Sequence, residues 1–242
     1  MPSMSPHFVL HHSPLKDCVD IRRKCAEKYD HILKRYGVEL PKNYATRITE
    51  NDEGDFFYII DKKTGEIVSA ARAAIASEKS YLPVEQIYKK VTGKYPYWRS
   101  NMKPNTYLEG CEHWVDIKYH GLRMTNLCIR SCMIVGLLKK VKNYIVFNNA
   151  YTVKHAECFG FKADPKLGDN GVLNYPDDRY PSVIGLLKLS QYASKLNSEE
   201  YRITNEILEN VEGSYSSEIK GQEIRVDYSI ADLISQPSAK TA

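Results

Sequence analysis

The chain has 242 residues, of which 43% are hydrophobic and 26% are charged. This length admits one large α/β domain or two small ones, and the composition excludes disorder as the dominant state. The 34 basic and 30 acidic residues leave a net charge of +4, spread along the chain. Such a charge does not indicate a nucleic-acid partner, but it is compatible with a basic pocket for one anionic ligand.

Secretion, membrane insertion and metal binding are all disfavoured by the sequence. The N-terminal residues lack the charged segment and long apolar run of a secretory signal. The most apolar stretch, 127–138, is too short to span a bilayer and contains Arg130. The six cysteines form no CxxC pair, and no His or Cys cluster completes a zinc set. We therefore expect a cytoplasmic protein with reduced thiols, no metal and no integral membrane segment.

The first elements are a strand and a long helix. Residues 7–12 are typical of a short strand. Ser13 as a cap and Pro14 at the first helical position predict the start of a helix over 15–37. Apolar residues recur every three or four positions along it, and Gly37 stands where a helix ends.

Two strands and several less regular stretches follow. Residues 56–61 and 66–75 are joined by a short loop that ends in Gly65, which predicts a hairpin. Three further stretches are a strand or sheet extension at 45–51, a helix at 84–93 and an aromatic loop at 95–104. That loop either lines an acyl pocket or packs as an ordinary surface loop.

The centre of the chain alternates strands and helices. The pattern predicts strands at 110–119, 143–149 and 182–190, with helices at 125–142 and 152–160 between them. This spacing is typical of a βαβ crossover arrangement. After 190 the chain is more polar, and we expect one or two helices followed by a strand at 222–230 and a disordered end.

The turn HGLRMTN, residues 120–126, joins a predicted strand to a predicted helix. The first N–H groups of a helix have no intrahelical partner and carry the positive end of the dipole, so such a turn can hold a phosphate. Gly121 allows a sharp bend, Arg123 and Arg130 add charge, and His120 can donate a hydrogen bond. The alternative is a simple connection, because every strand-to-helix turn has this geometry.

The next strand end and helix also carry polar groups. The amides of Asn148 and Asn149 either bind an extended ligand or simply end the strand. His155 and Cys158 lie one helical turn apart, which indicates neighbours rather than a catalytic pair.

Two acidic residues of the strand at 110–119 are candidates for a general base. Glu112 and Asp116 share one strand face with Trp114, while His113 points to the other face. A carboxylate beside a cleft can take a proton directly or through water. The alternatives are an exposed edge or a structural ion pair.

The order of these elements resembles that of the GNAT superfamily of N-acyltransferases over roughly residues 7–190. The superfamily has a first strand and helix, a hairpin, a central strand with a pyrophosphate loop, and a later helix that here would end at Gly160-Phe161. The resemblance implies an α/β fold, with a mixed (α+β) central sheet flanked by helices. It implies an acyltransferase domain at 1–190 and a partly helical C-terminal extension at 191–242.

Two positions depart from the superfamily pattern. The loop pattern R/Q-x-x-G-x-G/A falls on His120–Thr125, with Arg123 and Thr125 at the two glycine positions. The usual general-acid tyrosine falls on Ala156, which cannot donate a proton. These departures are similar to those of the acyl-homoserine-lactone synthases and long-chain N-acyl amino acid synthases, which often take the acyl chain from acyl carrier protein.

The central strand is also similar to that branch. Its WVD segment resembles the pattern R-F-x-V-D, with Trp114 in the aromatic position and His113 in place of the arginine.

The resemblance implies transfer of an acyl group from acyl-CoA or acyl-ACP phosphopantetheine to the amine of a small molecule such as an amino acid. The donor would enter between the strands at 110–119 and 143–149. The donor-binding residues implied are Ile117, Tyr119, His120, Gly121, Leu122, Arg123, Met124, Thr125, Asn126 and Asn149. Glu112 or Asp116 would act as base, and Tyr151 or His155 could substitute for the missing tyrosine.

Two alternatives stay open. One is a conventional acetyl-CoA-dependent N-acetyltransferase with a short pocket. The other is a degenerate domain that binds an acyl thioester or a protein partner and catalyses nothing.

Overall fold

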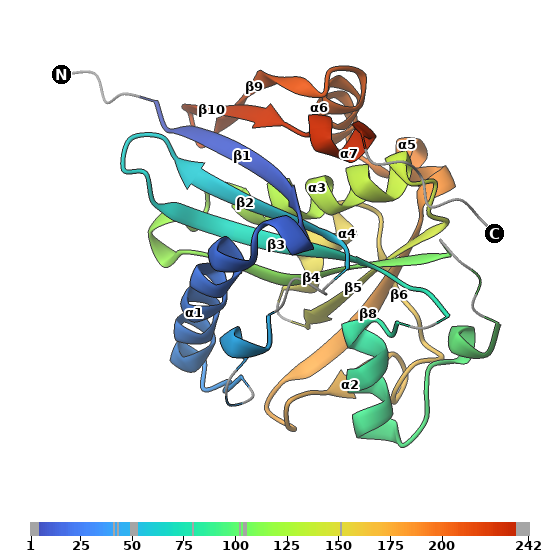
Figure 1. The fold of residues 1–242 in the computed structure, drawn as a ribbon. Coiled ribbons are helices and arrows are strands. Elements are labelled where there is room, and N and C mark those ends of the chain that lie inside the picture. Colours follow the sequence, from blue (N-terminus) through green and yellow to red (C-terminus); the bar gives the residue numbers. More distant parts are fainter. Residues whose placement is uncertain are drawn as a thin grey trace. The chain divides into compact units, whose positions relative to one another are not determined.

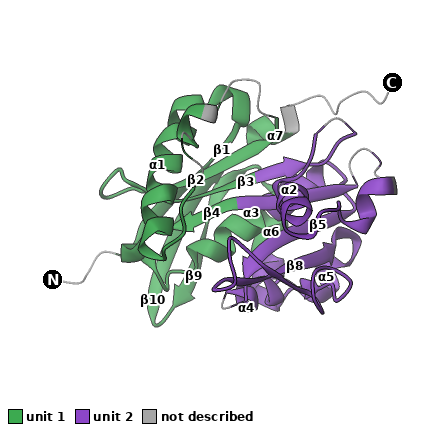
Figure 2. Cartoon of the chain, turned by 90° about the horizontal axis from the view of Figure 1, so that it is seen from below, with its two compact units in different colours: residues 1–72, 112–131, 203–242 green, residues 73–111, 132–202 purple. Residues whose placement is uncertain are grey.

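The computed structural model describes residues 5–40, 42, 44–48, 53–78, 80–101, 103, 106–150 and 152–235. The chain divides into two compact units, which Figure 2 shows in different colours. Unit 1 comprises residues 1–72, 112–131 and 203–242, and unit 2 comprises residues 73–111 and 132–202. The predicted boundary at residue 190 stays a prediction.

The secondary structure is mixed. The strands are β1 (His7–Pro14), β2 (Asp55–Asp61), β3 (Ile67–Ile75), β4 (Tyr107–Val115), β5 (Asn143–Asn149), β6 (Lys162–Ala163), β7 (Val172–Asn174), β8 (Pro181–Lys188), β9 (Glu212–Ile219) and β10 (Gln222–Ser229). The α-helices are α1 (Val19–Arg35), α2 (Pro83–Thr92), α3 (Met124–Leu138), α4 (Val153–Glu157), α5 (Tyr192–Lys195), α6 (Ser198–Glu209) and α7 (Ala231–Ser235). The strands are hydrogen-bonded in the order β6-β8-β5-β4-β3-β2-β1-β10-β9, with β7 paired to β8. Figure 1 shows β1 between β2 and β10. The predicted mixed sheet with flanking helices is confirmed.

In unit 1, α1 packs on one face of the sheet and α3 on the other. Cys25 of α1 lies in a buried cluster with Ala70 of β3 and Trp114 of β4. Ser69 points to the opposite face because side chains alternate along a strand. Its hydroxyl lies 3.1 Å from the Sγ of Cys128 on α3. The predicted hairpin of β2 and β3 is confirmed, and β1 pairs antiparallel with β2 and parallel with β10.

The start of α1 differs from the prediction. Ser13 and Pro14 do not cap the helix but belong to β1, which pairs with β2 as far as Pro14. The helix begins only at Val19, after Cys18, whose side chain caps no backbone group. Proline at a strand end loses no essential ladder bond, so pairing with β2 overrides the local cap signal. The predicted end is confirmed, because Gly37 has the left-handed φ of 72° that follows a helix.

Unit 2 contains the predicted parallel pair. β4 and β5 pair in parallel along Tyr107–Gly110 and Asn143–Val146. β4 then continues to Val115 and β5 to Asn149 beyond their last mutual pair. β8 runs antiparallel to β5, so the second strand–helix–strand step is not the parallel crossover that the sequence predicts.

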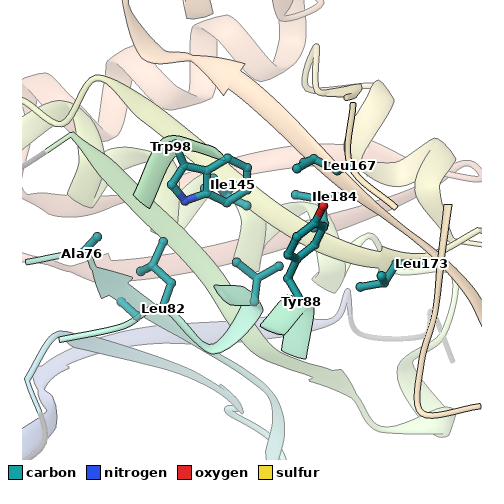
Figure 3. Packing of buried hydrophobic residues seen from close by; sticks show 10 residues of the cluster. Ala76, Leu82, Tyr88, Trp98, Ile145, Leu167, Leu173 and Ile184 are labelled. Atoms are coloured by element: carbon teal, nitrogen blue, oxygen red, sulfur yellow. The ribbon is translucent and has the colours of Figure 1, made fainter. Parts of the chain in front are cut away.

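The core of unit 2 forms where α2 packs on β5 and β8. Ile145, Ile184 and Tyr88 belong to one buried cluster together with Trp98 from the aromatic loop (Figure 3). The indole of Trp98 donates to the carboxylate of Glu85, 2.9 Å away and buried. Trp98 of the aromatic loop is therefore part of the core, which neither of the two predictions for this loop gave.

Several local predictions need correction. Ala45–Arg47 forms a 3-10 helix instead of a strand, and residues 49–51 of that prediction lie outside the described residues. The predicted tail helices and the strand at 222–230 are confirmed as α5, α6 and β10. The strand β9 was not predicted, because its Ser-rich sequence has little strand propensity. It forms by pairing with β10. Residues 236–242, expected to be disordered, lie outside the described part of the chain.

None of the helices in the described residues combines the length and apolar composition that a bilayer-spanning segment requires. Among the same residues, no cluster of three or more His, Cys, Asp or Glu side chains is arranged to hold a metal ion. None of the six cysteines, all of which lie in the described residues, forms a disulfide.

Candidate active site

Glu112 occupies a strained position in β4. Its φ of 54° lies in the left-handed region, which an ordinary residue inside a strand rarely adopts and which costs on the order of 1 kcal/mol. The carboxylate accepts a hydrogen bond from Nη1 of Arg72 at 3.1 Å, and only 17% of the Glu112 side chain is exposed. The structural ion pair, one of the alternatives open from the sequence, is therefore present.

The charge of Glu112 acts on the thiol of Cys25, which lies on α1. Burial, the largest cause, raises the pKa of the Cys25 thiol to about 12, and the negative charge of Glu112 contributes to the rise. Trp114 packs in the same cluster as Cys25. Arg72, the partner of Glu112, lies on β3 two residues after Ala70, which packs in this cluster, so Glu112 and Trp114 share one face as predicted.

His113 cannot supply the charge of the arginine whose place it takes. Burial lowers the pKa of its imidazole to about 4, so the ring is neutral at pH 7. The site therefore lacks the fixed positive charge that the related pattern has at this position.

Asp116 ends the strand and starts a tight turn. Its carboxylate accepts the backbone N–H of Lys118 at 3.1 Å, and a 3-10 helix spans Ile117–Tyr119. The N–H groups of Tyr119 and His120 bond to the carbonyls of Asp116 and Ile117 within this turn. The predicted strand to residue 119 is wrong. The N–H groups of Tyr119 and His120 are therefore occupied within the turn.

Tyr119 braces the turn against the β2–β3 hairpin. Its hydroxyl donates to Oδ2 of Asp61 at 2.8 Å, and its ring packs edge-on against Phe8. Burial, followed by the bond to Asp61, raises the pKa of Tyr119. Nζ of Lys118 lies 3.9 Å from the carboxylate of Glu66 on the same hairpin.

The loop after this turn leads into α3. Gly121 has a φ of 86° and Arg123 a φ of 54°, and α3 begins at Met124, one residue before the predicted start. Nε2 of His120 lies 3.3 Å from the carbonyl oxygen of Val115. The side chain of Met124 is buried, whereas Gly121 and Arg123 are exposed. Leu122, Thr125 and Asn126, the other members of the predicted donor-binding set in this loop, are half-buried.

Arg130 does not lie at the loop. It is buried farther along α3, where its Nη1 donates to the hydroxyl of Tyr215 on β9 at 2.9 Å. Its guanidinium also lies 5.4 Å from the centre of the Tyr215 ring. Arg130 therefore joins α3 to the C-terminal hairpin instead of adding charge to a phosphate site.

Lys220 is a basic residue at the loop that the sequence did not reveal. It occupies the turn between β9 and β10, and a Cβ added to Gly121 would lie 3.1 Å from its Nζ. No local signal indicates this neighbour, since the two residues belong to distant parts of the sequence.

The remaining predicted site residues belong to unit 2. Asn149 ends β5, half-buried, and its carbonyl accepts the N–H of Thr152 at 2.9 Å. His155 is exposed on the short helix α4, and Ala156, at the position of the usual acid, is buried. Tyr151 lies outside the described residues. Glu112, Asp116 and the loop at 117–126 all belong to unit 1.

Unit 2 also contains a cavity of about 330 Å³ beside the aromatic loop. Its lining residues are Tyr97, Tyr107, Asn143, Gly160, Lys162, Leu186, Leu187, Lys188, Gln191 and Lys195. The lining combines three exposed lysines with apolar and aromatic side chains.

Comparisons with solved structures place the chain among acyl-transferring proteins by fold. FeeM, an N-acyl amino acid synthase from uncultured soil microbes, matches with a TM-score of 0.57 and 16% identity over 79% of this chain and 96% of that chain. BjaI, a CoA-dependent acyl-homoserine lactone synthase solved with SAM and isopentyl-CoA, matches with a TM-score of 0.52 and 11% identity over 94% and 97%. MesI, another CoA-dependent acyl-homoserine lactone synthase, matches with a TM-score of 0.50 and 12% identity over 87% and 97%.

No protein-family model and no curated protein matches the chain in sequence. At these identities the likeness is one of fold. The GNAT-like fold that the order of elements implies is thereby confirmed, and the chain has the architecture of the N-acyl amino acid and acyl-homoserine lactone synthases.

Proposed function

We propose that the protein is an N-acyltransferase that moves an acyl group from an acyl thioester to the amine of a small molecule. The observation that carries this proposal is a basic, glycine-containing loop between β4 and α3, in a fold shared with FeeM and BjaI. In such a fold this loop is where the phosphate of the donor is expected to bind.

The donor is acyl-CoA or the acyl phosphopantetheine of acyl carrier protein, both of which carry a phosphate next to the pantetheine. The N-terminal end of α3 favours an anion, and Arg123 can add a charge-assisted hydrogen bond. Arg123 and Thr125 stand at the positions where the superfamily pattern has glycine. We infer that side chains contribute more to phosphate binding here than bare backbone does.

Glu112 is the better candidate for the base. The amine nitrogen attacks the thioester carbonyl, the C–N bond forms, the C–S bond breaks, and the ammonium proton must leave. The carboxylate of Glu112 can accept that proton, and its bond to Arg72 fixes its orientation. The carboxylate of Asp116 instead holds the backbone of Lys118. The thiolate needs little help from an acid because a thiol has a pKa near 8.5.

A donor and acceptor screen tests the proposal. Acetyl-CoA, a long-chain acyl-CoA and a long-chain acyl-ACP would each be incubated with pooled amino acids, and N-acylated products would be measured by mass spectrometry. We expect long-chain N-acyl products, and we expect CoA or acyl-ACP to raise the melting temperature. Turnover with acetyl-CoA alone would favour a conventional N-acetyltransferase. No transfer and no thermal shift with any donor would contradict the proposal.

A second candidate function is binding without catalysis. Its support is that Glu112 is engaged by Arg72 and that alanine replaces the usual acid at position 156. A protein that binds acyl thioesters tightly but yields no product with any amine would favour this candidate.

A further inference from the structure

The turn between β9 and β10 contains a lysine in a backbone conformation that costs stability. Ile219 pairs with Gln222, which leaves a two-residue connection of Lys220 and Gly221. Both residues have positive φ, 53° and 75°, as in a type I′ turn. Asn or Asp is preferred at the first of these positions, and a lysine there is strained. The turn geometry alone therefore does not explain why a lysine stands there.

The hairpin is attached to the rest of unit 1 on two sides. β10 pairs with β1 from His7↔Arg225 to His11↔Ser229. On the other side, Tyr215 of β9 accepts the buried bond from Arg130 of α3. The position of the turn relative to the start of α3 is thus set by backbone pairing and by a buried, charge-assisted hydrogen bond.

These attachments bring the Lys220 ammonium to the loop. A Cβ on Gly121 would lie 3.1 Å from Nζ and 3.9 Å from Cε of Lys220. Among the residues that the structure describes, the ammonium has no hydrogen-bond or ion-pair partner. The two acids that flank the turn, Glu218 and Glu223, are exposed and pair with each other across the strands, and neither makes an ion pair with Lys220 in the described structure. At the loop itself, Asp61 accepts from Tyr119 and Glu66 lies 3.9 Å from Lys118. A cation beside a glycine at φ 86°, with no anion assigned to it, is suited to bind an anion from solution.

We propose that Lys220 binds the phosphate next to the pantetheine of the donor, so that the C-terminal hairpin forms part of the donor site. This inference rests on the proposed function and adds to it a residue outside the loop. It explains how a loop without two of the usual glycines holds a phosphate, because the ammonium reaches the group from the opposite hairpin. CoA and holo-ACP both present this phosphate.

The test uses three probes on the full chain: CoA, holo-ACP and pantetheine, which lacks the phosphate. Lys220→Asn removes the charge while giving the turn a favoured residue, so its melting temperature is expected to equal or exceed that of the wild type. We expect about a 10-fold loss of CoA or holo-ACP affinity, unchanged pantetheine binding, and a weaker salt dependence than in the wild type. Lys220→Arg should retain most of the affinity.

Lys166→Ala is the matched control, since it removes one exposed lysine of unit 2 and lowers the net charge equally. If Lys220→Asn loses affinity for holo-ACP alone, the phosphate that Lys220 binds is that of the carrier protein. If it loses affinity for CoA, the phosphate is that of the coenzyme. Wild-type affinity for CoA and holo-ACP in Lys220→Asn would overturn this inference and leave the proposed function standing. A wild-type protein that binds none of the three probes would overturn both.

Discussion

Two hairpins approach the loop at 117–126, and the groups that each brings next to it carry opposite charges. The β2–β3 hairpin offers acids, Asp61 to the hydroxyl of Tyr119 and Glu66 to Lys118, so its groups are already paired. The β9–β10 hairpin offers the ammonium of Lys220, and its Tyr215 hydroxyl accepts a buried hydrogen bond from Arg130. The first hairpin positions the loop, and the second adds charge to it. The charge of a binding loop therefore cannot be judged from the loop's own residues.

The largest expected effect comes from removing the candidate base, Glu112, which lies on β4 and belongs to neither hairpin. Glu112→Gln keeps the shape of the side chain but removes the base, and we expect kcat to fall by about 100-fold or more. Steady-state kinetics with the best donor would measure this loss, while CoA affinity should stay within a few-fold of the wild type.

Arg72→Gln is the control for the ion pair. It leaves the carboxylate in place but loosens it, so a much smaller loss of kcat is expected. Equal losses in the two variants would mean that the ion pair, and not proton transfer, is what the reaction needs. A third variant, Asp116→Asn, should retain kcat if Glu112 is the base.

The next effect concerns the attachment of the second hairpin. Tyr215→Phe leaves the buried Arg130 without this acceptor, and hydrogen bonds to charged groups contribute about 1.5–3 kcal/mol. Urea unfolding should show a loss of this size. If the hairpin positions Lys220, the same variant should also weaken CoA binding without touching the ligand. Unchanged stability would show that the bond does not hold the hairpin.

The matching change in the first hairpin should cost less. Tyr119→Phe removes one bond to Asp61, which is only half-buried, and we expect a loss of about 0.5–1.5 kcal/mol in the same urea experiment. The Asp61 carboxylate would keep the N–H of Lys63 but lose the hydroxyl that stabilises its charge near the loop, so CoA affinity should fall. Asp61→Asn in the Tyr119→Phe background should restore that affinity. If CoA affinity is not restored, the charge of Asp61 is not the cause of the loss.

The smallest effect is an acid-dependent loosening of the second hairpin. Hydrogen bonds from Lys62, His7 and Arg225 outweigh burial and lower the pKa of Asp227 on β10. A carboxyl with a lowered folded pKa stabilises the protein above its unfolded pKa, and this contribution is lost as pH falls through the folded pKa. The wild type should therefore exceed Asp227→Asn in stability at neutral pH, and the difference should shrink below about pH 4. Thermal melts of both proteins between pH 7 and pH 3 would check this, and a pH-independent difference would contradict it.

The order of elements was predictable because its signals are local. Alternating residues, helical spacing and turn glycines such as Gly37 and Gly65 identify β1, α1, the β2–β3 hairpin, β4, α3 and β5. The loop at 120–126 follows from that order, since a strand before it and a helix after it can be seen in the sequence. The predicted start of α1 was wrong because strand pairing of Ser13 and Pro14 with β2 overrides their local helix-cap signal.

The site itself depended on contacts that no local pattern encodes. The left-handed φ of Glu112, its bond to Arg72 and the 3-10 turn at Ile117–Tyr119 all lie beyond the last pair of β4 with β5. Arg130 and Tyr215 meet across 85 positions of sequence.

The sequence by itself determined which segments become strands and helices, and where the loop between β4 and α3 falls. Only the tertiary structure decided which charges surround that loop. The parallel pairing of β1 with β10 carries Lys220 to Gly121, and a pairing between distant strands leaves no trace in the periodicity of either one.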